Sequence, residues 1–215
     1  MHIVIAGNIG AGKTTLTHLL ARHYGWTPRK EQVTDNPYLS DYYKDMKRWS
    51  LNLEVFFLKE RFKDLLKINH EKEAVVQDRS IYEGVYIFAA NNHDMGNMSD
   101  RDFDTYMGLF ESMMMVARKP DLLIYLRSSV PHLVDNIHQR GRDYEQNMQL
   151  NYLKNLNDRH DDFVFHQYPG RTLTIEVDNL DFQHSRSDFA YIVKRIDEQL
   201  VEIEGKENTL FKQIR

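Results

Sequence analysis

The sequence predicts an α/β fold, with a doubly wound parallel sheet of about five strands and helices on both faces. Three observations lead to this prediction. Five short segments are apolar or β-branched, longer stretches with helical periodicity separate them, and a glycine-rich turn follows the first segment. The expected strands cover residues 2–6, 27–31, 74–78, 121–126 and 172–177.

The first expected strand leads into a glycine-rich turn, Gly7-Asn8-Ile9-Gly10-Ala11-Gly12-Lys13-Thr14. This segment fits the pattern G-x-x-x-x-G-K-S/T, in which successive backbone N–H groups point inward and cradle phosphates. A helix is expected from Thr15 over residues 15–24, and its N-terminus favours an anion. In such a loop Lys13 reaches the β- and γ-phosphates of ATP, and Thr14 ligates Mg²⁺. The pattern therefore predicts an ATP-binding loop that includes Thr15; the alternative is a plain strand-to-helix turn.

Two long helices are expected between the later strands. Over residues 49–69, apolar side chains recur near the helical period, which predicts a core-facing side: Leu53, Phe56, Phe57, Leu58, Phe62, Leu65 and Leu66. Residues 103–117 are apolar on more than one side. A helix buried on two sides and a helix in a subunit interface explain that pattern equally well.

Length and composition narrow the range of functions. A chain of 215 residues is expected to form one domain over residues 1–203, followed by a polar tail at 204–215. The net charge of −4, with no long basic run, argues against a nucleic-acid partner and favours a small anion. The absence of cysteine excludes thiol catalysis and Cys-ligated zinc. No apolar run reaches the roughly 20 residues that span a bilayer, and no signal peptide is recognised, so we expect a cytoplasmic protein without a membrane partner.

Charged clusters follow the second strand, the third strand and the helix after the fourth: Lys30-Glu31-Gln32-Val33, Asp78-Arg79-Ser80 and Arg140-Gly141-Arg142-Asp143-Tyr144-Glu145. Ligands of doubly wound sheets bind beyond the carboxyl ends of the strands, so we expect these clusters to converge on the phosphate site. A carboxylate, an acid–arginine pair and an arginine-rich flap suit the transfer of a γ-phosphoryl group to an alcohol. Taken singly, a charged residue at a strand end is more often a solvated cap than a catalyst, and Arg140 and Arg142 also suit an ordinary exposed helix end.

Further motifs in order along the chain are Glu31-Gln32-Val33, Asn36-Pro37-Tyr38, Tyr42-Tyr43-Lys44-Asp45, Arg48-Trp49-Ser50, Asp78-Arg79-Ser80, Ile124-Tyr125-Leu126-Arg127 and Arg140-Gly141-Arg142. Over nearly its whole length the sequence resembles the deoxyribonucleoside kinases of the deoxycytidine/deoxyguanosine/deoxyadenosine kinase group. The resemblance implies a fold like that of the P-loop NTPases, with an arginine-rich lid at about 140–148. It also implies ATP- and Mg²⁺-dependent phosphorylation of the 5′-hydroxyl of a deoxynucleoside in nucleotide salvage. A homodimer through the helices at 49–69 or 103–117 is expected by the same analogy.

The resemblance also implies roles for individual residues around the acceptor. Glu31 is expected to act as the base that holds the 5′-hydroxyl, with Arg79 beside it. Tyr43 and Glu145 are expected to bind the 3′-hydroxyl and leave little room for a ribose 2′-oxygen.

For the donor, the resemblance implies that Asp78 lies near the metal, directly or through water. Arg140 and Arg142 are expected to close on the ATP phosphates. A loop over the ATP adenine is expected at Asp178, Asn179 and Phe182.

The sequence departs from the family pattern where the base is read. Glu54 stands in the place of a helix glutamine, Arg61 is present seven residues later, and Gly84 replaces the usual aspartate. One interpretation is that the negative partner of Arg61 has moved from position 84 to position 54. A carboxylate at 54 offers only acceptors, which suits a purine and favours guanine slightly, because guanine presents two adjacent donors. The alternative is that Glu54 lies on the wet face of its helix, between Leu53 and Val55.

Two smaller departures concern the charges at the phosphate site. Gln32 replaces a proline, and Asn136 stands where relatives carry another arginine. The clamp on the phosphates is therefore expected to depend on Lys13, Arg79 and the lid arginines.

Two alternative functions remain compatible with the motifs. A nucleoside monophosphate kinase such as thymidylate kinase shares the P-loop, the Asp-Arg motif and a lid, but needs extra cations for the acceptor's phosphate. A non-catalytic nucleotide-binding subunit keeps the fold but has usually lost Lys13, Glu31 or Arg79, and all three are present.

Overall fold

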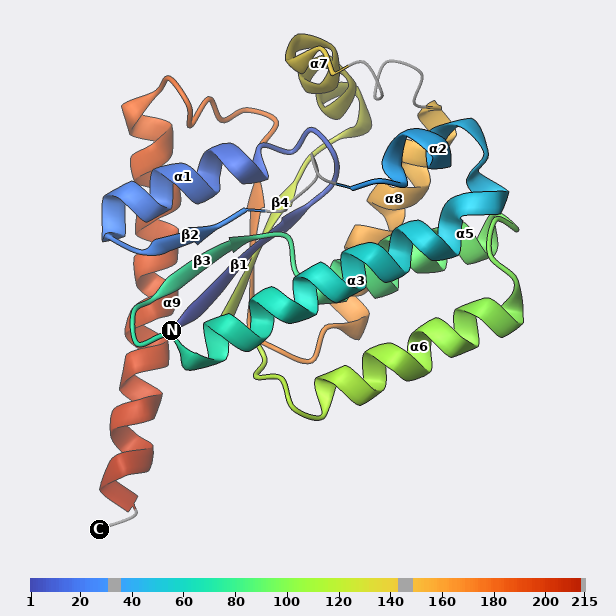
Figure 1. Cartoon of the computed structure of the whole chain (residues 1–215). Coiled ribbons are helices and arrows are strands. Elements are labelled where there is room, and N and C mark those ends of the chain that lie inside the picture. The colour runs from blue at the N-terminus through green and yellow to red at the C-terminus, as the bar shows by residue number, and fades with distance from the viewer. Residues whose placement is uncertain (31–35, 143–148, 214–215) are drawn as a thin grey trace.

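A five-stranded parallel sheet forms the centre of the computed structural model, which describes residues 1–30, 36–142 and 149–213 (Figure 1). Its strand order is β2-β3-β1-β4-β5, and all four neighbouring pairs are parallel. The strands are β1 His2–Gly7, β2 Thr27–Arg29, β3 Val75–Asp78, β4 Leu122–Arg127 and β5 Thr172–Glu176. The predicted fold class and all five strands are confirmed, although β2 ends two residues earlier than predicted.

Helices connect successive strands, as the parallel pairing requires. They are α1 Lys13–Tyr24, α2 Leu39–Lys44, α3 Met46–His70, α4 Ile81–Glu83, η1 Gly84–Ala89, α5 Ala90–Asp94, α6 Asp100–Met114, α7 Val130–Arg140, α8 Leu150–Asp162, η3 Phe163–Gln167 and α9 Arg186–Gln213. The labels η1 and η3 mark π-helical turns, so α4, η1 and α5 follow one another as a single helical stretch with a widened middle.

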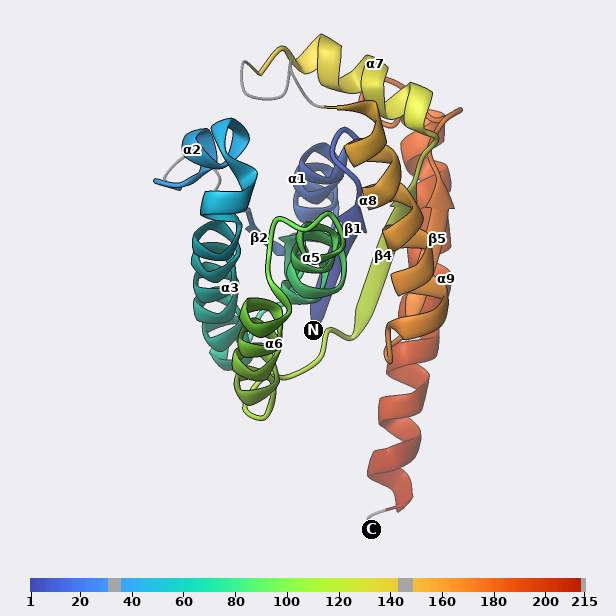
Figure 2. The ribbon, with the colours of Figure 1, turned by 90° about the vertical axis from the view of Figure 1, so that its right-hand side faces the viewer.

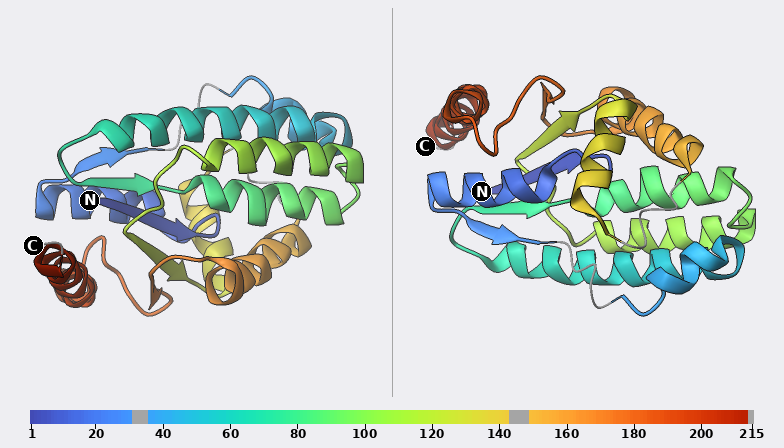
Figure 3. Two further views of the ribbon diagram at one scale, coloured as in Figure 1. Left: turned by 90° about the horizontal axis from the view of Figure 1, so that it is seen from below. Right: turned by 90° about the horizontal axis from the view of Figure 1, so that it is seen from above.

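The side chains of β1 alternate between two hydrophobic cores, one on each face of the sheet. Ile3 and Ile5 pack with α1 and α9, while Val4 and Ala6 pack with the helices around α3, α6 and α8. The turned views show the same two layers (Figures 2 and 3). Burial on both faces explains why β1 is apolar along its whole length.

Local capping fixes where several helices begin. Asp45 accepts a hydrogen bond from the Arg48 N–H at the start of α3, and Ser99 accepts one from Asp102 at the start of α6. Such side-chain caps satisfy backbone donors that have no partner inside the helix. They fix the first residues of α3 and α6, the helices that pack on the Val4 and Ala6 face of the sheet.

The two long helices agree with the prediction in position and differ in burial. In α3, Leu53, Leu58 and Leu65 are buried, but Leu66 is 37% exposed, so its assignment to the core was wrong. The expected helix at 103–117 ends at Met114 as α6, and one chain buries only one side of it, through Tyr106 and other residues of the same face. The alternative of burial on two sides within one chain is therefore wrong.

Helix α9 continues through Gln213. Most of the stretch 204–215, which was expected to be a polar tail, is therefore helical. Its C-terminal part extends past the edge of the sheet (Figures 1 and 2). Among the described residues, no helix has the length and apolar character that crossing a membrane requires.

Candidate active site

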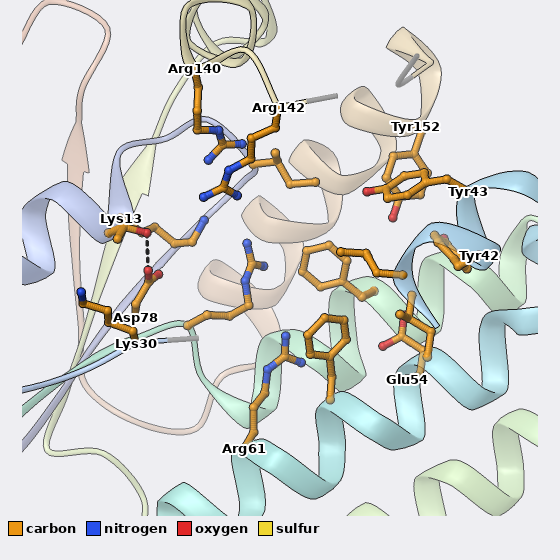
Figure 4. Close-up of a pocket in the computed structure, with 17 residues that line it drawn as sticks. Lys13, Lys30, Tyr42, Tyr43, Glu54, Arg61, Asp78, Arg140, Arg142 and Tyr152 are labelled. Carbon is orange, nitrogen blue, oxygen red and sulfur yellow. Dashed lines mark hydrogen bonds between the residues drawn. The ribbon is translucent and has the colours of Figure 1, made fainter. Parts of the chain in front are cut away.

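A cavity of about 350 Å³ opens at the carboxyl ends of β1 and β3, where Figure 4 shows charged side chains from several elements facing one another. Its position agrees with the rule that ligands bind beyond the carboxyl ends of strands in such sheets. The predicted site residues that line it are Ile9, Lys13, Thr14, Tyr43, Glu54, Arg61, Asp78, Arg79, Arg140 and Arg142.

The glycine-rich turn forms the loop between β1 and α1. Gly10 and Gly12 have φ angles of +88° and +86°, a region that side-chain-bearing residues rarely adopt. A Cβ on Gly12 would also lie 2.7 Å from Cζ of Phe182, so glycine is needed there for space as well. Lys13 is buried at the start of α1, and its Nζ donates to the Asn8 carbonyl oxygen at 2.9 Å. This geometry places an ammonium group inside the loop.

Three asparagines tie the loop to neighbouring helices. Asn8 Nδ2 donates to the Leu153 carbonyl oxygen at 3.0 Å and to Asn157 Oδ1 at 3.1 Å, both on α8. Asn136 Nδ2, on α7, donates to the Gly10 carbonyl oxygen at 2.9 Å. Asn136, which stands where relatives carry an arginine, therefore contacts the phosphate loop directly.

Thr14 and Asp78 meet at the proposed metal position. The hydroxyl of Thr14 donates to Asp78 Oδ2, and the register of β1 against β3 brings the two residues together because Ile5 pairs with Asp78. Both donors are hard oxygens, which Mg²⁺ prefers. No group of three His, Cys, Asp or Glu side chains that could hold a metal ion occurs in the described part of the chain.

Arg79 follows β3 in an unusual backbone conformation. Its φ is +69°, and it is the one non-glycine residue with positive φ in the part of the chain that the structure describes. The guanidinium lies over the Phe88 ring at 4.5 Å, and its Nη1 is 3.6 Å from Glu83 Oε1. Strained conformations of this kind concentrate at functional sites, where surrounding contacts hold them.

Glu83 lies beneath the loop and was not predicted. It is fully buried, its Oε1 accepts from the Gly7 N–H at 3.2 Å, and its Oε2 accepts from the Ser80 N–H at 2.8 Å. Burial alone would raise the pKa of this carboxyl, but contact with His160 and the charges of Arg79 and Lys13 lower it to about 2. A sequence signal existed, because Ser80 and Glu83 have the spacing of a capping box, which the structure contains.

Glu54 and Arg61, both on α3, line the cavity from the side of that helix (Figure 4). Glu54 is 2% exposed and Arg61 is 7% exposed, so the alternative that Glu54 lies on a wet helix face is wrong. The Arg61 guanidinium is 5.1 Å from the Phe57 ring and also lies against Gly84, where an added Cβ would overlap its Nη1. The absence of a side chain at 84 leaves the space that the Arg61 head group occupies.

The predicted lid arginines lie at the C-terminal end of α7. Gly141 ends that helix with a φ of +66°, and Arg140 and Arg142 on either side of it are exposed and line the cavity. In Figure 4 both point down toward Lys13. Their placement at a helix end follows from the glycine cap.

The predicted adenine loop divides into residues with different surroundings. Asp178 Oδ1 accepts from Ser129 N–H at 2.9 Å and from Ser128 Oγ at 2.8 Å, and so supports the start of α7. Asn179 is exposed, and the Phe182 ring packs on Gly12 of the phosphate loop. This loop therefore lies beside the phosphate loop.

Two predicted residues, Glu31 and Glu145, lie outside the described residues, as do Gln32 and Val33. Lys30, from a cluster that was expected to converge on the phosphate site, also lines the cavity. The cavity residues that were not predicted are Leu39, Tyr42, Leu53, Phe57, Phe88 and Tyr152. Most are aromatic or apolar. A periodic apolar pattern marks such residues as buried, but it does not separate a core from a cavity wall.

Comparison with known proteins identifies the family. A family model described as deoxynucleoside kinase matches residues 3–202. The chain belongs to the deoxynucleoside kinase family. A deoxynucleoside kinase is a phosphotransferase that uses ATP to convert a nucleoside to its monophosphate, and this activity excludes the non-catalytic subunit and the monophosphate kinase as alternatives.

Relatives of this deoxynucleoside kinase include the deoxyadenosine/deoxycytidine kinase of Bacillus subtilis (strain 168), with 38% identity over 90% of each chain. The deoxyguanosine kinase of Lactobacillus johnsonii is 34% identical, over 94% of this chain and 93% of that one. Among solved structures, the deoxyadenosine kinase from M. mycoides with bound dATP is similar, with a TM-score of 0.81 and 28% identity. That match covers 92% of this chain and 99% of the other.

Proposed function

We propose that this kinase transfers the γ-phosphoryl group of ATP to the 5′-hydroxyl of a purine deoxynucleoside, with Mg²⁺. The observation that carries the proposal is one cavity that is lined by the phosphate loop and also by Glu54 and Arg61 of α3 (Figure 4). Phosphoryl transfer needs the donor phosphate and the acceptor alcohol aligned in one enclosed space.

Cations of the chain surround the phosphate end. Lys13 is positioned by the Asn8 carbonyl oxygen to meet the terminal phosphates, and Arg79 is held between Phe88 and Glu83 beside it. Charge that develops on the transferring group is stabilised by such preorganised donors. The exposed Arg140 and Arg142 add charge from the lid side and exclude water when they close.

Thr14 and Asp78 are the residues that would hold Mg²⁺. When bound with ATP, the ion neutralises negative charge on the β- and γ-phosphates. The Thr14 hydroxyl is placed by its hydrogen bond to Asp78, so this oxygen pair already faces the loop. Glu31 remains the predicted base for the 5′-hydroxyl, and it follows β2 next to the cavity residue Lys30.

The cavity residues Glu54, Phe57 and Phe88 suit the binding of a purine base. Phe57 and Phe88 provide apolar ring surface, and Glu54 provides hydrogen-bond acceptors. Guanine offers two adjacent donors, N1–H and the exocyclic amine, whereas adenine and cytosine each offer one donor beside an acceptor. The proposal therefore places deoxyguanosine first and deoxyadenosine second. Tyr43, which lines the cavity, and Glu145 are proposed to bind the 3′-hydroxyl.

The test is a coupled assay of ADP release with each of the four deoxynucleosides and with guanosine. We expect turnover with the purine deoxynucleosides, less with the pyrimidines and least with the ribonucleoside. No turnover with any deoxynucleoside would overturn the proposal.

We further propose a homodimer through α3 and α6. These helices lie side by side as an outer layer (Figures 2 and 3), and large apolar side chains on or beside them are exposed. The exposed residues are Val55, Leu66, Leu109, Met115 and Val116. Pairing through these two helices would remove such side chains from water, which is favourable.

Light scattering on the eluting protein is expected to give the mass of two chains. Leu109→Lys should shift this mass toward one chain, because it places a charge among apolar side chains. Val201→Lys, at an exposed apolar residue of α9, is the matched control. A single-chain mass for the wild type would contradict the dimer.

A further inference from the structure

A buried asparagine on α5 contacts the proposed base-reading residue. Asn92 has no exposed surface, and its Nδ2 donates to Glu54 Oε1 at 3.0 Å. It is distant in sequence from Glu54, and no motif of the sequence marks it. The contact is nevertheless specific, because a buried polar group without a partner is costly.

The hydrogen bonds of Asn92 orient its amide. Its Oδ1 accepts from the Tyr42 hydroxyl at 2.9 Å and from Asn97 Nδ2 at 3.4 Å. Burial raises the pKa of the Tyr42 hydroxyl to about 12, so this group stays protonated near neutral pH and keeps a proton to donate. The Glu54 carboxylate on the other side can only accept, so the amide directs its own N–H toward Glu54.

We propose that Asn92 is a positioning residue that sets the hydrogen-bond polarity of the base pocket. Its amide N–H binds Oε1 of Glu54. The base therefore contacts the other terminal atom of the side chain at position 54, which is Oε2 in glutamate. This inference rests on the proposed base-reading role of Glu54.

The consequence depends on which residue stands at 54. With glutamate, the atom that meets the base is an oxygen, which can only accept. With glutamine, the amide oxygen must turn to the Asn92 N–H, so the amide N–H₂ group would meet the base as a donor. With Asn92 present, Glu54→Gln therefore changes the group that meets the base from a hydrogen-bond acceptor to a hydrogen-bond donor. Without Asn92, a glutamine could rotate and offer either atom.

A double-mutant cycle tests this. The readout is the ratio of kcat/KM for deoxyguanosine to kcat/KM for deoxyadenosine, in the wild type, Glu54→Gln, Asn92→Ala and the double variant. In the Asn92 background, Glu54→Gln should lower the ratio about 10- to 100-fold, mainly through KM, because a mispaired buried group opposes the wrong base. In the Asn92→Ala background, the same substitution should change the ratio less than about threefold, because the glutamine can rotate.

Asn91→Ala is the matched control. Asn91 is also a buried amide of α5, but its Nδ2 contacts Met95 Sδ. It should leave the effect of Glu54→Gln unchanged. Asn92→Leu keeps a similar volume and removes the donor, so it repeats the test if Asn92→Ala does not fold, and it should also abolish the full change from acceptor to donor.

The outcomes separate the two levels of the proposal. Equal changes in the ratio in the Asn92 and Asn92→Ala backgrounds would overturn the role of Asn92 and leave base reading by Glu54 intact. An unchanged ratio in the Glu54→Gln single variant would overturn base reading by Glu54, and the role of Asn92 with it. ADP release with any deoxynucleoside is measured separately, so kinase activity itself is judged on its own.

Discussion

Lys13 is the residue on which we propose that phosphate binding depends most directly. It is buried at the first turn of α1, where its ammonium group meets a backbone carbonyl of the loop. A charged group in this setting needs little rearrangement when a phosphate arrives, and preorganised donors of this kind account for large shares of catalysis.

Lys13→Ala is expected to lower kcat about 100- to 1000-fold, since one preorganised donor to the transferring phosphate is lost. The measurement is steady-state ADP release at saturating deoxynucleoside, with circular dichroism to establish folding. His18→Ala, on the same helix α1, is the control and should retain near-wild-type kcat. A kcat within threefold of wild type for Lys13→Ala would contradict the role.

Gly84 leaves space for the guanidinium of Arg61. A methyl group there would overlap Arg61 Nη1, and the flexible guanidinium would have to move. Gly84→Ala is therefore expected to raise KM for the deoxynucleoside about tenfold, corresponding to about 1.4 kcal/mol of lost binding, with KM for ATP unchanged. Gly108→Ala is the matched control, because open space surrounds that glycine of α6. Equal KM values for the two variants would remove Arg61 from the nucleoside site.

Individual residues also show how far sequence reasoning reaches. The glycine loop could be predicted because its pattern is local and its chemistry needs particular residue types. Glu83 could have been predicted from its capping-box spacing with Ser80. Asn92 could not, because its contact with Glu54 arises from the packing of α5 on α3 and leaves no periodic or local signal.

At the scale of elements, helix α7 connects Arg140 and Arg142 to the phosphate loop. Asn136 donates to the Gly10 carbonyl oxygen, and one turn later the helix ends at Gly141, between these two arginines. The strands of the sheet were predicted well because each is a short apolar run between helices. The burial of α6 was predicted less well, since an apolar pattern does not say whether a second chain or the same chain covers it.

Asn136→Ala is expected to raise KM for ATP about three- to tenfold and to leave KM for the deoxynucleoside unchanged. One intramolecular hydrogen bond is worth about 1 kcal/mol, and this partly buried one contacts the phosphate loop. His138→Ala, an exposed residue of the same helix, should leave both constants unchanged. Parallel increases in both KM values would show that α7 supports the whole cavity rather than the phosphate loop.

At the scale of the whole molecule, the carboxylate of Glu83 links the sheet, the phosphate loop and α8. Its pKa lies near 2 in the folded protein, below the ordinary 4.5. A carboxyl with a pKa lowered by folding stabilises the protein above the unfolded pKa, and this contribution disappears as the pH falls toward the folded pKa. Stability should therefore decrease as the pH falls below about 4.5.

Glu83→Gln is expected to be about 3 kcal/mol less stable than wild type near neutral pH, since it leaves Arg79 buried without its carboxylate. Its free energy of unfolding should then fall less steeply with acidification. Urea unfolding at several pH values gives both quantities. Glu176→Gln, at an exposed carboxyl of β5, should keep the wild-type slope. A slope equal to wild type in Glu83→Gln would contradict the linkage.

The left-handed backbone of Arg79 belongs to a residue that is hard to replace. Glycine would adopt that conformation with less strain, by about 1 kcal/mol. It would also remove the guanidinium from the cavity and leave the buried Glu83 carboxylate without its ion-pair partner, which costs more than the strain that it relieves. Laboratory evolution toward heat resistance and toward turnover should therefore both retain arginine at this codon.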